Sequence, residues 1–366
     1  MRVLMISKAC VVGAYQIKLE ELARFPGLDL TVVTPPYWRD ERGVLPLERQ
    51  HTAGYDLVVE SMALNGNFHL HFYPHLSRQI QRVQPDLVHI DEEPYNLATA
   101  HALWLARRAG AKSLFFSWQN ILRRYPLPFR MLERYVLSRA DQAIVGNQDA
   151  VAVWRAKGYA GPVDVIPQFG VDLEVFQPAP RPEGRGFVVG YVGRLVEEKG
   201  VDLLLEALAG LEGMWRAYIL GDGPQREALQ AQARDLGLAD RVTFDPWIAS
   251  DQMPTYYQQL DALVLPSRTR ANWKEQFGRV LIEAMACGVP AVGSDSGEIP
   301  NVLGDAGLVF PEGDVGELRA HLSSLLRDLD LRADLAQQGR QRVLAHYTQA
   351  HVAAQTHQVY QLMLAS

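Results

Sequence analysis

Two glutamates in the second half of the chain, Glu275 and Glu283, have the chemistry and spacing of ligand-binding residues. Between them, Gly278 permits close approach of a ligand to the backbone, and the run Val280–Ala286 has helical periodicity. The sequence therefore predicts a helix that begins just after Glu275 and contains Glu283. The unpaired backbone N–H groups at such a helix start bind anions, especially phosphate.

The ligand that suits this arrangement carries phosphates between two polyhydroxylated groups, because each carboxylate can accept hydrogen bonds from hydroxyls. A nucleotide sugar has this layout. The backbone groups expected to bind its phosphates are those of Phe277, Gly278, Arg279 and Val280. The spacing alone also fits a simpler interpretation, in which Glu283 faces solvent and Glu275 only stabilises the first helical turn.

Two cations, Arg194 and Lys199, lie in the segment GYVGRLVEEKG, after the first expected strand of the second half. With Gly193 next to them, they can converge on a compact anion held close to the backbone, such as a diphosphate leaving group. The alternative is a surface ion pair with Glu197 or Glu198.

Two further glycines follow expected strands. Gly221 belongs to the turn Gly-Asp-Gly-Pro, and Gly13 follows the first strand of the chain. Either could allow a phosphate or sugar to approach the backbone, and each also fits an ordinary turn.

The elements that must position these residues form one pattern along the whole chain. Short β-branched or apolar runs alternate with longer helical segments, which is typical of βαβ units and parallel sheets, so the expected fold class is α/β with two doubly wound halves. Ligands of such sheets bind at the carboxyl ends of the strands. The expected strands are Arg2–Ile6, Asp29–Thr34, Asp56–Glu60, Asp86–Ile90, Ser113–Trp118, Asp141–Gly146, Val163–Pro167, Phe187–Gly193, Trp215–Gly221, Arg241–Phe244, Asp261–Pro266, Pro290–Ser294 and Leu308–Phe310.

Domain boundaries follow from composition. Residues 176–186 contain three prolines and two glycines and have no periodicity, so we predict a linker there. The predicted domains are 1–175 on the acceptor side and 187–345 on the nucleotide-sugar side. The last residues, 346–366, are predicted to form a helix that can pack back on the first domain. The expected active site lies in the cleft that the two domains face.

Between Gly190 and Phe310 the motifs GYVGRLVEEKG, YILGDGP, ALVLPS, KEQFGRVLIEAMACGVP and SDSGEIPNVLGDAGLVF occur in this order. Together they resemble the retaining GT-B glycosyltransferases of family four, the glycosyl transferases group 1. The resemblance implies that Arg194 and Lys199 hold the donor diphosphate and that Glu275 contacts the donor sugar. It also implies that Glu283 binds the ribose and that transfer is metal-independent, retains the anomeric configuration and uses no cofactor beyond the nucleotide sugar itself.

The first half is a looser match to this family. Where the family carries a histidine near the reacting sugar, the segment FSWQN places Gln119, which cannot titrate but can hydrogen-bond a sugar hydroxyl. On the acceptor side we expect Glu92, with its neighbour Glu93, to orient a hydroxyl, and Tyr15 and Trp118 to stack on a sugar. Helix capping by the glutamates and core packing of the rings are the alternatives.

No residue pair offers a convincing covalent nucleophile. The resemblance therefore suggests front-face substitution, in which the departing diphosphate accepts the proton of the acceptor hydroxyl. Two other functions stay open on the same architecture: a nucleotide-sugar epimerase, and a binding protein that keeps the donor site without turnover.

The composition of the chain argues against several other classes of protein. The 366 residues are 48% hydrophobic and 21% charged, which favours folded domains over disorder, and the net charge of −6 argues against a nucleic-acid partner. Two cysteines, Cys10 and Cys287, are too few for a disulfide framework and suit the cytoplasm. Apolar runs are too short for a signal peptide or a membrane span.

One basic segment stands out in this acidic chain. Residues 105–140 contain eight arginines and lysines and a single acid, Glu133. This segment could contact an anionic membrane from the cytoplasmic side, or a phosphate-bearing acceptor, and a solvated helix face is the alternative. The expected partners are thus a nucleotide sugar, an acceptor that is a sugar, a lipid-linked sugar or a small metabolite, and the inner face of a membrane.

Overall fold

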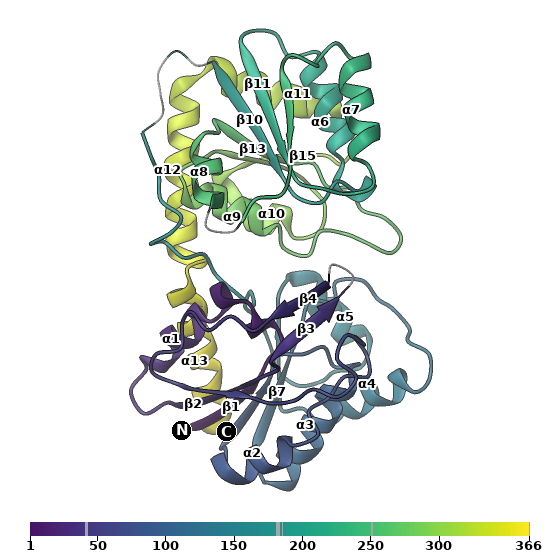
Figure 1. Cartoon of the computed structure of the whole chain (residues 1–366), viewed down its shortest axis with the longest axis vertical. Coiled ribbons are helices and arrows are strands. Elements are labelled where there is room, and N and C mark those ends of the chain that lie inside the picture. The colour runs from purple at the N-terminus through teal and green to yellow at the C-terminus, as the bar shows by residue number, and fades with distance from the viewer. Residues whose placement is uncertain (41–42, 181–183, 185, 250–251, 366) are drawn as a thin grey trace. The chain divides into compact units, whose positions relative to one another are not determined.

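The computed structural model describes residues 1–40, 43–180, 184, 186–249 and 252–365 (Figure 1). Their contacts divide the chain into two compact units. Unit 1 comprises Met1–Gly170 with Gln349–Ser366, and unit 2 comprises Val171–Thr348. The expected linker, 176–186, falls partly on residues 181–183 and 185, which lie outside the described part. Phe176 at its start is buried in the core of unit 2.

Unit 1 is built on a seven-stranded sheet whose strand order is β5-β2-β1-β6-β7-β8-β9, with every neighbouring pair parallel. Its central strands are continuous apolar runs in the sequence, because helices cover both faces of a parallel sheet and bury the side chains on each face. The strands are β1 (Arg2–Ile6), β2 (Asp29–Thr34), β5 (Asp56–Val59), β6 (Leu87–Ile90), β7 (Lys112–Ser117), β8 (Gln142–Val145) and β9 (Val163–Val165). The helices are α1 (Ile17–Ala23), α2 (Leu76–Val83), α3 (Leu97–Arg108), α4 (Phe129–Leu137) and α5 (Gln148–Ala156).

Unit 1 also contains an antiparallel hairpin that the sequence pattern did not predict. Strands β3 (Tyr37–Asp40) and β4 (Gly43–Pro46) pair with each other outside the main sheet. Both strands are largely exposed, so they lack the buried apolar side chains that mark a strand in the sequence.

Unit 2 is built on a six-stranded parallel sheet with the order β12-β11-β10-β13-β14-β15. The strands are β10 (Phe187–Val192), β11 (Trp215–Leu220), β12 (Val242–Asp245), β13 (Ala262–Leu265), β14 (Ala291–Ser294) and β15 (Leu308–Phe310). The helices are η3 (Glu197–Lys199), α6 (Val201–Ala209), α7 (Arg226–Asp235), α8 (Met253–Gln258), α9 (Arg279–Ala286), α10 (Ile299–Leu303), α11 (Val315–Arg327) and α12 (Leu329–His346). Two doubly wound α/β units confirm the predicted fold class.

The last helix of the chain, α13 (Gln349–Ala365), belongs to unit 1 and packs against α1. His357 of α13 stacks on Phe25 with ring centroids 4.1 Å apart, and the Tyr360 hydroxyl hydrogen-bonds Nδ1 of His89 at 2.6 Å. His89 is therefore a buried residue of β6.

Candidate active site

An ion pair between Lys199 and Glu275 lies at the carboxyl ends of β10 and β13. The Lys199 ammonium is 2.5 Å from Oε2 of Glu275, and the Ser267 hydroxyl donates to the same oxygen at 2.9 Å. Glu275 is only 7% exposed. The structure thus brings together two residues that the sequence predicted for one site. The alternative was a surface ion pair of Lys199 with Glu197 or Glu198, but Lys199 pairs with Glu275 instead.

The backbone around Glu275 is fixed by the turn between β14 and α10. The Glu298 N–H donates to the Glu275 carbonyl at 3.1 Å, and a Cβ at Gly297 would lie only 2.0 Å from that oxygen. Ser294 donates to the Ser267 carbonyl at 2.6 Å. No role was expected for Ser267 or Gly297, although Ser267 ends the motif ALVLPS and Gly297 lies in SDSGEIP.

Helix α9 begins just after Glu275, as predicted. Its N-cap is Gly278 at φ +81°, a conformation that favours glycine, and a Cβ there would lie 3.0 Å from Leu265 and from Leu281. The N–H groups of the first turn have no partner within the helix, so they can bind an anion. The Phe277 ring packs edge-on against Tyr347, with ring centroids 5.7 Å apart.

Glu283 is held on both sides of its carboxylate. The Tyr257 hydroxyl donates to Oε2 at 2.8 Å, and Nε of Arg279 lies 2.7 Å from Oε1. Burial, followed by the charge of Glu283, raises the pKa of Tyr257 well above its ordinary value, so the hydroxyl stays a donor. Because Glu283 is 7% exposed, the interpretation that it faces solvent is wrong.

The glycine loops after β10 and β11 touch each other. A Cβ at Gly221 would lie 1.8 Å from the Gly193 carbonyl oxygen, so only glycine fits at Gly221, where φ is +149°. The Tyr191 hydroxyl donates to the Arg194 carbonyl at 2.8 Å, and the Arg194 side chain is exposed. Among the donor-side candidates, Lys199 and Glu275 contact each other directly, and α9 begins at Arg279, shortly after Glu275 in the chain.

In unit 1 the predicted residue Glu92 lies in a buried charge cluster after β6. Its carboxylate binds the Lys8 ammonium and lies 3.4 Å from Nε2 of His71. Burial alone raises the pKa of Glu92, but Lys8 and then His71 outweigh it and lower the pKa to about 2. Glu92 is therefore ionised and paired with Lys8.

Glu93 has the opposite electrostatic setting. The Ser117 hydroxyl donates to Oε2 at 2.6 Å and the Trp118 N–H donates to Oε1 at 2.8 Å, yet burial dominates and raises the pKa of Glu93 to about 7. A carboxyl group that titrates near neutral pH at the carboxyl ends of β6 and β7 can exchange a proton there.

The other acceptor-side candidates are already engaged with unit 1. Gln119 donates to the Ile121 carbonyl at 2.9 Å and accepts from Lys157 at 3.4 Å. The Trp118 indole donates to Gln168 at 2.9 Å, and Tyr15 stacks on Phe169 at 4.0 Å. These contacts support the packing interpretation for one face of Tyr15.

Gly13 is packed against the segment that follows β4. Its N–H donates to Oε2 of Glu48 at 2.7 Å, and a Cβ would lie 2.4 Å from Oε1 of Gln50. A side chain at Gly13 would thus displace the exposed Gln50 side chain, which can move.

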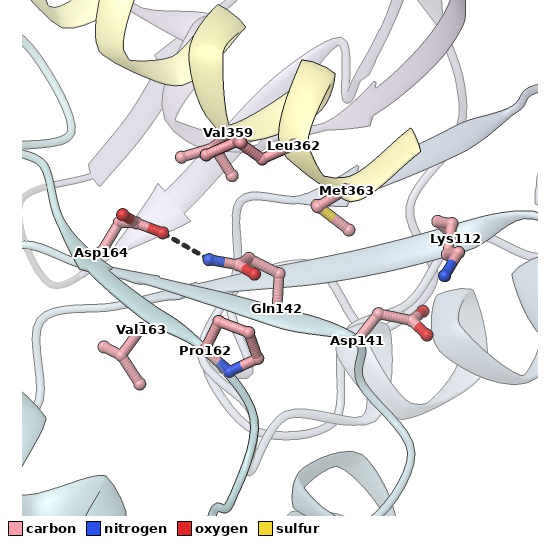
Figure 2. A pocket seen from close by; sticks show the side chains of 9 residues that line it. All are labelled: Lys112, Asp141, Gln142, Pro162, Val163, Asp164, Val359, Leu362 and Met363. Atoms are coloured by element: carbon pink, nitrogen blue, oxygen red, sulfur yellow. Dashed lines mark hydrogen bonds between the residues drawn. The ribbon is translucent and has the colours of Figure 1, made fainter. Parts of the chain in front are cut away.

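A cavity of about 400 Å³ lies elsewhere in unit 1 (Figure 2). Lys112, Gln142 and Val163, the first residues of β7, β8 and β9, line it together with Leu362 and Met363 of α13. It therefore lies at the amino ends of the strands, whereas ligands of parallel sheets bind at the carboxyl ends.

Within residues 1–40, 43–180, 184, 186–249 and 252–365, no three His, Cys, Asp or Glu side chains are grouped as metal ligands would be. None of the helices in that same part of the chain is long and apolar enough to cross a membrane.

Solved structures share this fold. The chain matches sucrose-phosphate synthase from Thermosynechococcus elongatus over 100% of both chains, with a TM-score of 0.73 and 22% identity. It matches HepE of Anabaena in complex with UDP over 99% of this chain and 100% of that one, with a TM-score of 0.72 and 19% identity. Two Rossmann-like units with these neighbours define a GT-B fold.

Sequence relatives give the family. Residues 174–342 match the model for glycosyl transferases group 1, and residues 19–175 match that for glycosyltransferase family 4. A D-inositol 3-phosphate glycosyltransferase of Mycolicibacterium smegmatis is 31% identical over 327 residues, 82% of this chain and 67% of the relative. A GDP-mannose-dependent phosphatidylinositol monomannoside mannosyltransferase of the same species is 31% identical over 66% of this chain and 68% of its own length.

The chain belongs to the glycosyl transferases group 1 family and is a glycosyltransferase. It spans about two thirds of the length of these two curated relatives.

Proposed function

We propose that this protein transfers a hexose from a nucleoside diphosphate sugar to an acceptor hydroxyl with retention of the anomeric configuration. The observation that carries the proposal is the contact of Lys199 and Ser267 with the buried carboxylate of Glu275, just ahead of α9 in the chain. A cation, a carboxylate and a helix start at one sheet edge match the phosphate and sugar of such a donor. Relatives named as GDP-mannose-dependent, and a fold neighbour solved with UDP-glucose, support this donor class.

In this proposal the donor diphosphate binds Lys199, Arg194 and the N–H groups of residues 277–280. The Lys199 ammonium has three N–H donors, so it can keep Glu275 while a second donor reaches a phosphate oxygen. Glu275 then accepts a hydrogen bond from a hydroxyl of the transferred sugar. Glu283 accepts a hydrogen bond from a ribose hydroxyl, using a carboxylate lone pair that Tyr257 and Arg279 do not occupy.

The proposed reaction needs no covalent enzyme intermediate. The bond between the sugar C1 and the phosphate oxygen breaks while the acceptor oxygen bonds to C1 on the same face. The proton of the acceptor hydroxyl passes to the departing phosphate oxygen. Lys199 and the start of α9 stabilise the charge that grows on the diphosphate, which lowers the barrier because that charge is largest in the transition state.

The acceptor side of the proposal rests on unit 1. We assign Trp118, which is partly exposed, to the acceptor sugar, with Gln119, Tyr15 and Glu92 holding the loops around it. The names of three relatives indicate small or lipid-linked polyols as the acceptor class. They are a D-inositol 3-phosphate glycosyltransferase, a phosphatidylinositol monomannoside mannosyltransferase and a 2-deoxystreptamine N-acetyl-D-glucosaminyltransferase.

A melting-temperature panel with UDP-, GDP- and ADP-linked sugars tests the donor, because a ligand that binds only the folded state raises the melting temperature. The expected result is a shift with one nucleotide class, then transfer whose product keeps the donor's anomeric configuration by NMR. An inverted product would overturn the retaining mechanism. A changed sugar formed without acceptor would indicate an epimerase, and binding without transfer or hydrolysis would indicate a binding protein.

A further inference from the structure

Helix α4 and the turn before it present arginines and large apolar side chains to solvent. Leu127 and Met131 are 70% and 63% exposed, and Arg130 and Arg134 are exposed as well. The Arg130 N–H donates to the Pro126 carbonyl at 3.1 Å in the turn before α4, which begins at Phe129. Arg134 lies four residues after Arg130 and three after Met131, so these three side chains share one side of α4, and Leu127 lies in the turn that precedes it.

The opposite face of α4 holds the helix in place. Val136 and Leu137 are buried in the core of unit 1, and Leu132 packs against that core. Glu133, the single acid in residues 105–140, is buried and binds Lys157. Within residues 105–140, no exposed acid thus offsets the positive charge on the outward face of α4. The side chains on that face do not belong to the core of unit 1.

The positive surface continues on both sides of α4. Arg123 and Arg124 are exposed in the segment before it. At its other end, Arg107 from the last turn of α3 donates to the Arg139 carbonyl at 3.2 Å. Eight cations against one acid lie within residues 105–140 of a chain whose net charge is −6.

One partner satisfies both kinds of side chain. Lipid phosphates bind arginines while Leu and Met enter the boundary between headgroups and acyl chains. A soluble polyanion would bind the arginines and leave Leu127 and Met131 in water, and an apolar protein surface would leave Arg130 and Arg134 unpaired. We propose that residues 122–134, the segment before α4 and its outward face, dock on an anionic phospholipid surface.

This surface lies next to the predicted acceptor side of unit 1. Tyr125, in the same segment, stacks on Tyr95 with ring centroids 4.3 Å apart, and Tyr95 follows Glu93 after β6. A lipid-linked acceptor would therefore arrive beside the docked segment. That consequence rests on the proposed function, whereas the docking does not.

The test is cosedimentation of the full chain with vesicles, without donor or acceptor. The vesicles are phosphatidylcholine alone or mixed with phosphatidylglycerol. Binding is expected only to the mixed vesicles and should weaken between 0.1 M and 1 M salt, since the screening length falls from about 10 Å to about 3 Å. The variant L127S/M131S/R130Q/R134Q should bind at least about 25-fold more weakly, at about fivefold per arginine.

A matched control carries the same four changes in unit 2. Met214 and Leu329 are 73% and 66% exposed, and Arg216 and Arg234 are exposed. The variant M214S/L329S/R216Q/R234Q should bind like the unchanged protein, and both variants should keep its melting temperature within a few degrees. Equal loss in both variants, no preference for phosphatidylglycerol, or binding that soluble glycerol phosphate abolishes would each overturn the proposal. Failure of sugar transfer would leave this result unaffected, because no transfer is measured.

Discussion

The ion pair between Lys199 and Glu275 gives the sharpest test of the donor site. In Glu275→Gln the side chain keeps its shape and can still accept from Ser267, but the charge that balances Lys199 is removed. Removing one partner of a buried ion pair costs about 3 to 5 kcal/mol. The Lys199 side chain retains 19% exposure, so water offsets part of this, and we expect about 3 kcal/mol.

This cost translates into measurable changes. For a unit of this size, 1 kcal/mol lowers the melting temperature by about 2 to 4 °C, so the transition of unit 2 should fall by about 6 to 12 °C. Turnover should fall about 100- to 1,000-fold, because a group that orients or stabilises the transition state is lost. Differential scanning calorimetry and a transfer assay at saturating donor measure the two effects.

A double-mutant cycle separates the interaction energy of the Lys199–Glu275 pair from other effects of each substitution on stability. Adding Lys199→Met to Glu275→Gln removes the unbalanced charge, so the double variant should be about 2 kcal/mol more stable than the sum of the single changes predicts. Asp202→Asn, which breaks the partly exposed pair with Arg268 in the same unit, should keep turnover and cost no more than about 1 kcal/mol. A folded Glu275→Gln protein with unchanged turnover would refute the proposed role.

Three further predictions concern single sites. Gly278→Ala should lower the free energy of unfolding by about 2 kcal/mol and weaken donor binding. The control Gly237→Ala has a similar φ and no neighbour within 4 Å, so it should lower that free energy by about 1 kcal/mol and leave donor binding unchanged. Equal effects of the two changes in urea unfolding and donor titration would contradict this prediction. Glu92→Gln should lower the stability of unit 1 by about 3 kcal/mol near neutral pH, because Lys8 loses its buried partner. This loss should shrink as the pH falls from 4.5 toward 2, where wild-type Glu92 is itself protonated. Glu93 binds its proton more tightly in the folded state, so wild-type stability should decline as the pH rises from 4.5 to about 7, and Glu93→Gln should remove that decline in a pH series of melting curves.

The sequence predicted the elements closely. Each predicted strand is present with ends that differ by at most two residues, and α9 (Arg279–Ala286) begins one residue before the predicted helical run Val280–Ala286. These features are local, because burial on two faces of a sheet dictates an apolar run and an apolar helix stripe dictates a period near 3.6. The exposed hairpin β3–β4 carries no such pattern and was missed.

The motifs likewise determined which residues to examine, including Glu275, Lys199 and the helix start at Gly278. Only the tertiary structure decided their partners. Lys199 and Glu275 are 76 positions apart in the chain, and Lys8 and Glu92 are 84 apart. Such pairs meet because the strand order of a sheet brings distant strand ends together, and no local periodicity encodes that order. The same holds for Glu92 and Glu93, which are adjacent in the sequence. Their pKa values shift in opposite directions because the fold places different groups against each carboxylate, and the sequence alone could not predict this.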